Sequence, residues 1–452
     1  MKRFVLLLSI TALLLGASAI AATPDAASSL GKDIRSKVLP NGMKIIVWPD
    51  HDIPNVVIYD WFHVGSRNEV TGITGLSHFF EHMMFNGAKK YGPGEFDRVM
   101  EAAGGSNNAF TSENVTVYED WFPKSALRTI FDLEADRIQN LAFDPKMIDS
   151  ERGVVYSERR SSVDNNNFGL LSEQVQSTAF LAHPYHNPVI GWPSDIESWT
   201  REDLVRYFRT YYAPNNATMI VTGDVTPDEI FSLAEQYLGP IPRHDPPPPI
   251  RTKEPAQKGE RRVEITKAAQ VPILQMAWHI GNATDADLPA VNLLLSILTE
   301  GDSSRLYRRL VDQERQALRV DAYADEGFDP GLAWMMVTLS ADGNLDRTEK
   351  IIDEEIARIA HDGPTPAEVT KVKNMFLAQF WGGLETINGK ARALGEYEVF
   401  HGDYHQLFSA PATYEAVTAE QIRDVAAKYF TPTNRTVGQL VPAAGNAPEA
   451  SR

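Results

Sequence analysis

Two histidines and a glutamate lie within five residues of each other in the segment GLSHFFEHMMFNG, which contains His78, Glu81 and His82. The segment has no proline and is rich in apolar residues, which favours a helix, and Gly87 is a natural stop. On a helix, residues four apart project from one face, so both imidazoles can reach a single zinc ion. Glu81 shares that face and is placed to take a proton from a water molecule on the metal.

The alternative is a chance triplet on an ordinary helix. The aromatic and methionine neighbours of the triplet predict that the helix is buried, where imidazoles and a carboxylate are costly unless something satisfies them. A metal ion would satisfy them. The chain has no cysteine, so any metal must be held by His, Asp and Glu, and both disulfides and thiol catalysis are excluded.

A second predicted helix, DPKMIDSERGVVYSERR, carries carboxylates on a largely apolar face. Asp144 is a suitable N-cap, with Pro145 at the first helical position. Glu151 and Glu158 lie two turns apart and could supply the third protein ligand that zinc needs. The alternative is a pair of partly exposed helix acids. The predicted buried face of this helix carries Met147, Ile148, Val154 and Val155. The basic residues Arg159 and Arg160 are predicted to face solvent.

The H-x-x-E-H motif, followed 76 residues later by the glutamate that ends ERGVVYSE, resembles the inverzincins, the pitrilysin or insulinase-type zinc metallopeptidases of family M16. The single duplicated unit is similar to the bacterial, processing-peptidase-like branch. The resemblance implies one Zn²⁺ per chain held by His78, His82 and Glu158, with Glu81 as general base and Glu151 as a supporting carboxylate. It also implies an endopeptidase that acts on peptides or unfolded segments.

The segment GGSNNAFTSENVTVY, residues 104–118, adds to this resemblance. In the family, this region supplies an edge strand against which the substrate backbone pairs by strand addition. The alternative is an ordinary loop and strand. The resemblance assigns substrate binding to five consecutive residues: Asn107, Asn108, Ala109, Phe110 and Thr111.

The two halves of the chain repeat each other. The segment from Thr200 matches the segment from Thr418 at an offset of 218, and the segment at Trp61 matches Ala277 at an offset of 216. Each half mixes strands and long helices, which predicts an α+β fold of two homologous domains, each an antiparallel sheet packed with helices, together one half of a clamshell. The predicted strands in the first half are 44–48, 56–63 and 218–222. The predicted organisation is a signal peptide (1–21), a zinc-bearing domain (30–240), a Pro-rich linker (241–262), a domain without metal (263–442) and a flexible tail (443–452).

The second half lacks the residues that would do chemistry. Leu294, Ile297 and Leu298 stand where the first half has its motif. Many family members carry an Arg and a Tyr here that contact the substrate carbonyl. This chain has Val311 at the first position and Leu318 or Arg319 at the second. A slipped alignment would nominate Arg315 and Tyr323 instead. The resemblance therefore predicts a dimer, either a homodimer or a heterodimer with a homologous chain that carries the Arg/Tyr pair.

The first 21 residues combine Lys2 and Arg3 with an apolar core and small residues, which is typical of a cleaved signal peptide rather than a membrane anchor. This predicts a periplasmic or secreted protein without a membrane span. The net charge is −17, or −19 without Lys2 and Arg3, which argues against nucleic-acid binding and favours either simple solubility or a chamber that attracts basic peptides. Two other functions remain open, a non-catalytic assembly subunit and a maturase of one peptide-derived cofactor.

Overall fold

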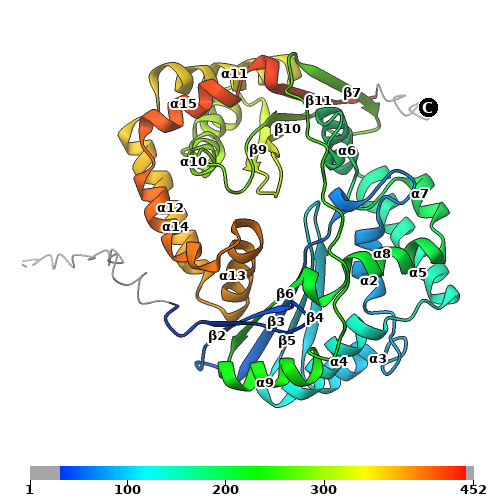
Figure 1. Cartoon of the computed structure of the whole chain (residues 1–452). Helices are drawn as coiled ribbons and strands as arrows, with labels where there is room; N and C mark the ends of the chain where they lie inside the picture. The colour runs from blue at the N-terminus through cyan, green and yellow to red at the C-terminus, as the bar shows by residue number, and fades with distance from the viewer. Residues whose placement is uncertain (1–30, 444–452) are drawn as a thin grey trace, which may run out of the picture.

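The computed structural model describes residues 31–443, which form two lobes that are each built on one β-sheet (Figure 1). The predicted signal peptide and residues 444–452 of the predicted tail lie outside the described residues. The first sheet has the order β1-β2-β6-β3-β5-β4 and the second has the order β7-β11-β8-β10-β9. The strands are β1 Arg35–Val38, β2 Lys44–Pro49, β3 Asn55–Phe62, β4 Ser106–Thr111, β5 Thr116–Pro123, β6 Ala217–Gly223, β7 Arg261–Lys267, β8 Ile273–His279, β9 Ala317–Ala324, β10 Leu332–Leu339 and β11 Arg435–Pro442.

The predicted fold of two α+β units is confirmed, with one difference in the sheets. Most neighbouring strands are antiparallel, but β2 pairs in parallel with β6, and β7 pairs in parallel with β11. In each lobe this pair joins an early strand to the last strand. Most of the lobe lies between the two strands in the chain and provides the long crossover that a parallel pair needs.

Both lobes contain the same helix–turn–strand unit near their C-terminal end. Helix α8 (Arg201–Tyr211) precedes β6 as α15 (Ala419–Tyr429) precedes β11, and each helix begins with a capping box. In the turns, Asn216 Nδ2 donates to the Tyr211 carbonyl at 2.9 Å, and Asn434 Nδ2 donates to the Tyr429 carbonyl at 2.8 Å. The repeated sequence therefore builds the same local structure twice.

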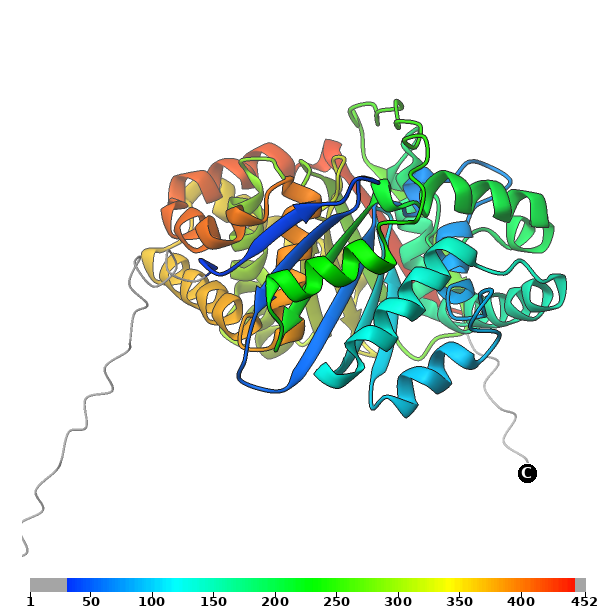
Figure 2. The same cartoon turned by 60° about the horizontal axis from the view of Figure 1, so that its bottom comes forward.

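Further helices complete the lobes, and α4 and α9 lie across the strands of the first sheet (Figure 2). The first lobe contains α2 (Leu76–Met83), α3 (Glu95–Ala102), α4 (Leu127–Asn140), α5 (Pro145–Arg159), α7 (Pro193–Ser198) and α9 (Pro227–Tyr237). The second lobe contains α10 (Leu288–Thr299), α11 (Leu345–Asp362), α12 (Pro366–Gly383) and α14 (Ala410–Ala416). None of the helices between residues 31 and 443 combines the length and apolar character needed to cross a bilayer.

The lobes exchange one helix each. Helix α6 (Asn167–Ala179) packs on the second sheet, and α13 (Ile387–His401) packs on the first, as Figure 1 shows. Successive residues of β3 point to opposite faces, so Ile58 packs in the core of the first lobe while Val57 packs in a separate core that contains residues of α13. Each sheet is therefore covered on one face by a helix from the other half of the sequence.

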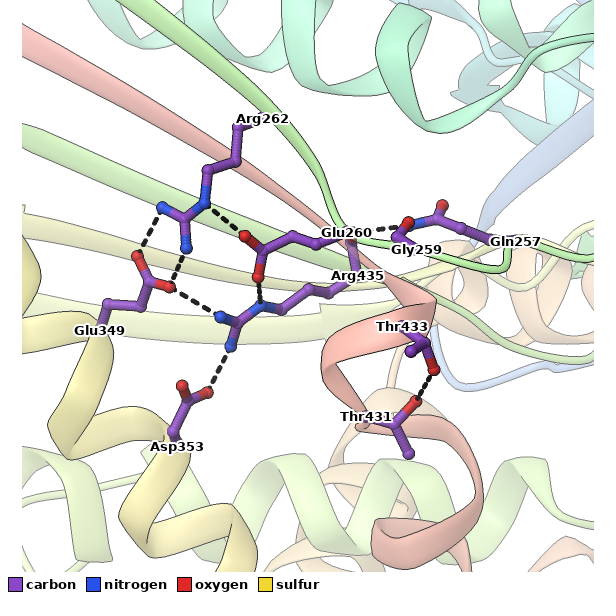
Figure 3. Close-up of polar contacts among 9 residues, drawn as sticks. All are labelled: Gln257, Gly259, Glu260, Arg262, Glu349, Asp353, Thr431, Thr433 and Arg435. Atoms are coloured by element: carbon purple, nitrogen blue, oxygen red, sulfur yellow. Dashed lines mark hydrogen bonds and ion pairs between the residues drawn. The ribbon is translucent and has the colours of Figure 1, made fainter.

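Residues 241–260 connect the lobes without a helix or strand. An ion-pair network fixes the end of this connection to the second sheet (Figure 3). Glu260 pairs with Arg262 on β7 and with buried Arg435 on β11. Both arginines also bond Glu349 on α11, at 3.0 and 2.8 Å, and Arg435 bonds Asp353 at 2.6 Å. The alternating charges satisfy the buried guanidinium, which would otherwise be costly.

The exchanged helices require glycine where they approach the sheets. A Cβ atom at Gly395 of α13 would lie 2.2 Å from the Trp61 ring. We expect Gly395→Ala to lower the free energy of unfolding by about 1–3 kcal/mol because of this overpacking. Gly382→Ala on α12, where nothing lies within 4 Å, is the matched control and should not lower it. Chemical denaturation measures both, and equal stability of the two variants would contradict the tight approach.

Candidate metal centre

Helices α2 and α5 carry the five residues that the sequence nominates for metal chemistry. Helix α2 ends at Met83, four residues before the predicted stop at Gly87. The side chain of Asn86 donates to the His82 carbonyl at 3.1 Å and so satisfies an acceptor at the end of the helix. Helix α5 begins as predicted, with the Asp144 side chain accepting from the Lys146 amide and Pro145 in the first turn.

The side chains of His78, His82 and Glu158 converge between these helices. One donor atom from each lies within 4.8 Å of the other two. The Nε2 atoms of His78 and His82 are 3.6 and 3.4 Å from the two oxygens of Glu158. Two imidazole nitrogens and one carboxylate oxygen form a donor set that zinc accepts, so the residues fit the metal that the sequence predicts.

Glu151 contacts His82 at Nδ1, the ring nitrogen that does not face Glu158. Its Oε1 atom is 2.7 Å from His82 Nδ1, and its Oε2 accepts from Asn86 Nδ2 at 2.8 Å. A hydrogen bond at Nδ1 places the proton there and leaves His82 Nε2 free to bind a metal, which is the usual arrangement behind histidine ligands. Glu151 therefore lies where a supporting carboxylate is expected.

The charges of the cluster suit cation binding. The nearby imidazoles, first His78 and then His82, hold the pKa of the Glu158 carboxyl well below its usual range. The hydrogen bond from His82 lowers the pKa of Glu151. Burial alone would lower the pKa of His82, but its bonds to the two glutamates outweigh this effect and raise the pKa to about 9. Both carboxylates are therefore ionised at neutral pH, and a metal must replace a proton on His82.

Glu81 points toward the edge of the first sheet. Its Oε2 accepts a hydrogen bond from Thr111 Oγ1 at 2.6 Å. Thr111 is the last residue of β4, which pairs only with β5 and forms the edge of the sheet. The structure thus brings together the predicted base and one end of the predicted substrate strand.

The other four residues assigned to substrate binding have different surroundings. Asn108 is exposed on β4. Asn107 Nδ2 donates to Asp97 of α3 at 3.0 Å, away from Glu81. The Phe110 ring lies 6.0 Å from the Trp61 ring, with Arg392 of α13 at 5.5 Å. Ala109 pairs with Tyr118 in the β4–β5 ladder.

Two predictions about the faces of α5 are wrong. Val154 was expected in the core, but it is 49% exposed, one turn before Glu158. Arg159 was expected to face water, but it is 3% exposed and binds Glu173 of α6 through two bonds of 2.8 and 3.0 Å. The acid that pairs with Arg159 comes from a different helix, so the pattern of α5 alone cannot reveal it.

Two buried acidic residues near the start of α2 were not predicted from the sequence. Glu69 accepts hydrogen bonds from the amides of Gly75 and Ser77 at 2.6 and 2.7 Å. Asp195 of α7 accepts from the Thr74 amide and hydroxyl at 3.0 and 2.7 Å. The N-cap of α2 is Gly75, which has no side chain, so Glu69 satisfies the first helical amides in its place. The sequence does contain an indication of this contact, because Glu69 lies six residues before Gly75, the glycine at which the predicted helix begins.

The second lobe has apolar residues at the corresponding positions. Leu294, Ile297 and Leu298 are buried on α10. Val311 packs against the core of that lobe, and Leu318 is 61% exposed on β9. Arg319 pairs with Asp321. The slipped alignment nominated Arg315 and Tyr323 instead. Arg315 has a backbone φ of 51°, and the ring of Tyr323 stacks on that of Trp334.

Comparison with known proteins agrees with this arrangement. Residues 49–192 match the family model described as Insulinase (Peptidase family M16), and residues 198–376 match the one described as Peptidase M16 inactive domain. The chain belongs to peptidase family M16. The family that the zinc motif predicted is therefore confirmed, and the "inactive" description falls on the half that lacks the motif.

Several M16 proteins match nearly the whole chain. The Zinc protease PqqE of Helicobacter pylori is 29% identical over 98% of this chain and 99% of that protein. The probable mitochondrial-processing peptidase subunit beta of Arabidopsis thaliana is 25% identical over 91% of this chain and 78% of that protein. The crystal structure of a protease from Helicobacter pylori has 29% identity and a TM-score of 0.87 over 90% of this chain and 99% of that chain.

The contact between Glu151 and His82 predicts a measurable effect on metal affinity. We expect Glu151→Ala to weaken zinc binding by about 10–100-fold, because the imidazole loses the group that orients it. Glu101→Ala, at an exposed position of α3, is the control. Competition with a chromophoric chelator measures both constants. Unchanged affinity in Glu151→Ala would show that Glu151 does not support the metal.

Proposed function

We propose that this M16 protein is a zinc-dependent endopeptidase that hydrolyses peptides or unfolded polypeptide segments. The observation that carries the proposal is the convergence of His78, His82 and Glu158, whose donor atoms lie within 4.8 Å of one another. These three residues are the proposed ligands of one Zn²⁺ per chain. The zinc proteases among the relatives support the same assignment.

Zinc held by these three residues would supply Lewis-acid chemistry, which would polarise the scissile carbonyl and make the attacking water more acidic. Glu81 is the proposed general base, which takes the proton of the attacking water and passes it to the leaving amine. The hydroxyl of Thr111 holds the Glu81 carboxylate through its 2.6 Å bond. Glu151 orients His82 through Nδ1.

The proposed substrate site is the edge strand β4, residues 106–111. An edge strand carries unpaired backbone groups, which an extended peptide can bind by adding a strand. The strand ends at Thr111, which contacts Glu81, so a paired peptide would pass beside the proposed base. Main-chain pairing suits a peptidase that acts on unfolded segments, since it does not depend on the side chains of the substrate.

Two variants distinguish the proposed role of Glu81 as general base from that of His78 as a zinc ligand. We expect Glu81→Gln to keep zinc and the fold but to lower kcat by about 10²–10⁴-fold, because only the base is removed. His78→Ala should lose both zinc and activity. Metal analysis and cleavage of a peptide library by the purified protein measure these outcomes. Wild-type turnover in Glu81→Gln would remove this residue from the mechanism, and undiminished zinc in His78→Ala would refute the ligand assignment.

We also propose that the chain acts in the periplasm or after secretion as the zinc-bearing subunit of a dimer. The signal-like residues 1–21 support export. The second lobe has Val311 where many members of the family carry the Arg, and Leu318 or Arg319 where they carry the Tyr. A homologous chain with that pair would supply the missing donors to the developing oxyanion, which favours a heterodimer over a homodimer.

The heterodimer predicts low activity of the isolated chain. A preorganised donor to the oxyanion typically contributes about 10²–10³ in rate, so adding the homologue encoded nearest to this chain should raise kcat by that factor. Peptide cleavage with and without the second protein measures the effect, and the same protein with its Arg replaced is the control. Full activity of the isolated chain would contradict the heterodimer. Absence of hydrolysis in both samples would instead favour an assembly subunit.

A further inference from the structure

The connection between β9 and β10 in the second lobe, residues 325–331, reaches into the first lobe near the candidate site. Besides His183 and Tyr185, it contacts two segments there. One is the turn of residues 112–115 that follows β4. The other is the short 3-10 helix η1 (Ser66–Asn68), which lies in the segment that leads to α2. The second lobe therefore contacts both the turn that follows the proposed substrate strand and the segment that precedes α2.

At the first segment, Asn114 is the common acceptor. Its Oδ1 accepts from the Tyr185 hydroxyl at 2.6 Å and from the Phe328 amide at 3.2 Å. The Tyr185 hydroxyl in turn accepts from the Asp329 amide at 3.2 Å. Asn114 and Tyr185 are 8% and 4% exposed, so water does not compete effectively for these bonds.

Glycine is needed at the point of closest approach. A Cβ atom at Gly327 would lie 2.5 Å from the Tyr185 hydroxyl and 3.0 Å from Asn114 Nδ2. Gly327 is buried, and its carbonyl accepts from the Ala283 amide at 2.9 Å, which fixes the loop to its own lobe. The loop therefore cannot move away to make room for a side chain without breaking its own contacts.

At the second segment, the contacts are ionic and aromatic. Asp329 forms an ion pair with Arg67 of η1 and lies 3.2 Å from Nε2 of buried His183. The Arg67 guanidinium also lies 5.2 Å from the centre of the Phe328 ring. The Arg67 amide donates to the Glu113 carbonyl at 3.0 Å. One loop thus ties η1 and the turn after β4 to each other as well as to the second lobe.

This connection bears on the proposed catalytic base. Thr111 bonds Glu81 and lies directly before the turn that Asn114 anchors. As an edge strand, β4 has a neighbouring strand on one side only. Helix α2 packs against it, and the contacts of the turn that follows β4 add to this support. We propose that residues Gly327–Asp329 are a positioning element that, through Tyr185 and Asn114, holds the end of β4 at a fixed distance from α2. The inference rests on the proposed peptidase function, and it makes Tyr185 and Asn114 positioning residues rather than catalytic ones.

The expected consequence is a loss of catalysis without a loss of metal. A displacement of about 1 Å in a substrate-positioning segment can cost about 10²-fold in rate. We expect Gly327→Ala to lower kcat/KM for an unstructured peptide of about twelve residues by about 10–100-fold, with zinc content unchanged. Tyr185→Phe, which removes only the hydroxyl, should lower it by about 5–10-fold. Gly259→Ala, where nothing lies within 4 Å, is the matched control.

Peptide binding by a catalytically inactive variant distinguishes a positioning role of residues Gly327–Asp329 from a role in stability alone. In Glu81→Gln protein, fluorescence anisotropy should show weaker peptide binding on adding Gly327→Ala or Tyr185→Phe, and equal binding on adding Gly259→Ala. A fall in thermal stability with unchanged kcat/KM and unchanged peptide affinity would overturn the inference. If Gly327→Ala does not fold, Tyr185→Phe decides alone. Absence of hydrolysis by the wild-type protein, alone and with its homologue, would instead refute the proposed function.

Discussion

The candidate site depends on two helices far apart in the chain, α2 and α5, which must hold three donor atoms within 4.8 Å of one another. Buried contacts elsewhere in the structure fix each of these helices. Neither helix alone sets the distance. Helix α2 is fixed at its start by the carboxylates of Glu69 and Asp195, which accept from the backbone that enters the helix. Helix α5 is fixed at its end by Arg159, next to Glu158, through the buried pair with Glu173. Buried charges are costly unless they are paired, so an arrangement that separated Arg159 from Glu173 would be destabilised.

The sheet of the first lobe carries buried charged residues at positions where the sheet of the second lobe has apolar ones. Beneath α2 lies a buried group formed by Asp60, Asp120, Glu134 and Arg137. Burial raises the pKa of Asp60 and Asp120, and Arg137 lies 4.6 Å from the ring of Tyr118, whose hydroxyl donates to a carbonyl of α2. At the equivalent sheet positions the second lobe has only apolar side chains, Met276 and Val337. The same sheet is thus built without these charges, which accompany the lobe that carries the metal residues.

The exchange of α6 and α13 makes the lobes interdependent. Each sheet completes its second core with a helix from the other half, and the Glu173 that pairs with Arg159 lies on one of the exchanged helices. The lobe without metal residues therefore supports the site in two places. It packs against α6, whose Glu173 pairs with Arg159 next to Glu158, and its loop at Gly327 contacts the turn that follows β4. The second lobe, which has apolar residues at the positions of the motif, is therefore part of the support of the site in the first lobe.

The sequence by itself determined the features that depend on short spacing or on repetition. His78 and His82 project from one face of a helix because they lie four residues apart, and the duplication is visible because equivalent capping and turn residues recur at a constant offset. Only the tertiary structure decided that Arg159 is buried, that Val154 is exposed, that Thr111 holds Glu81, and that the lobes exchange helices. These features join residues that lie tens to hundreds of positions apart. No local period encodes such contacts, because their free energy comes from burial and pairing that exist only once the distant segments have packed together.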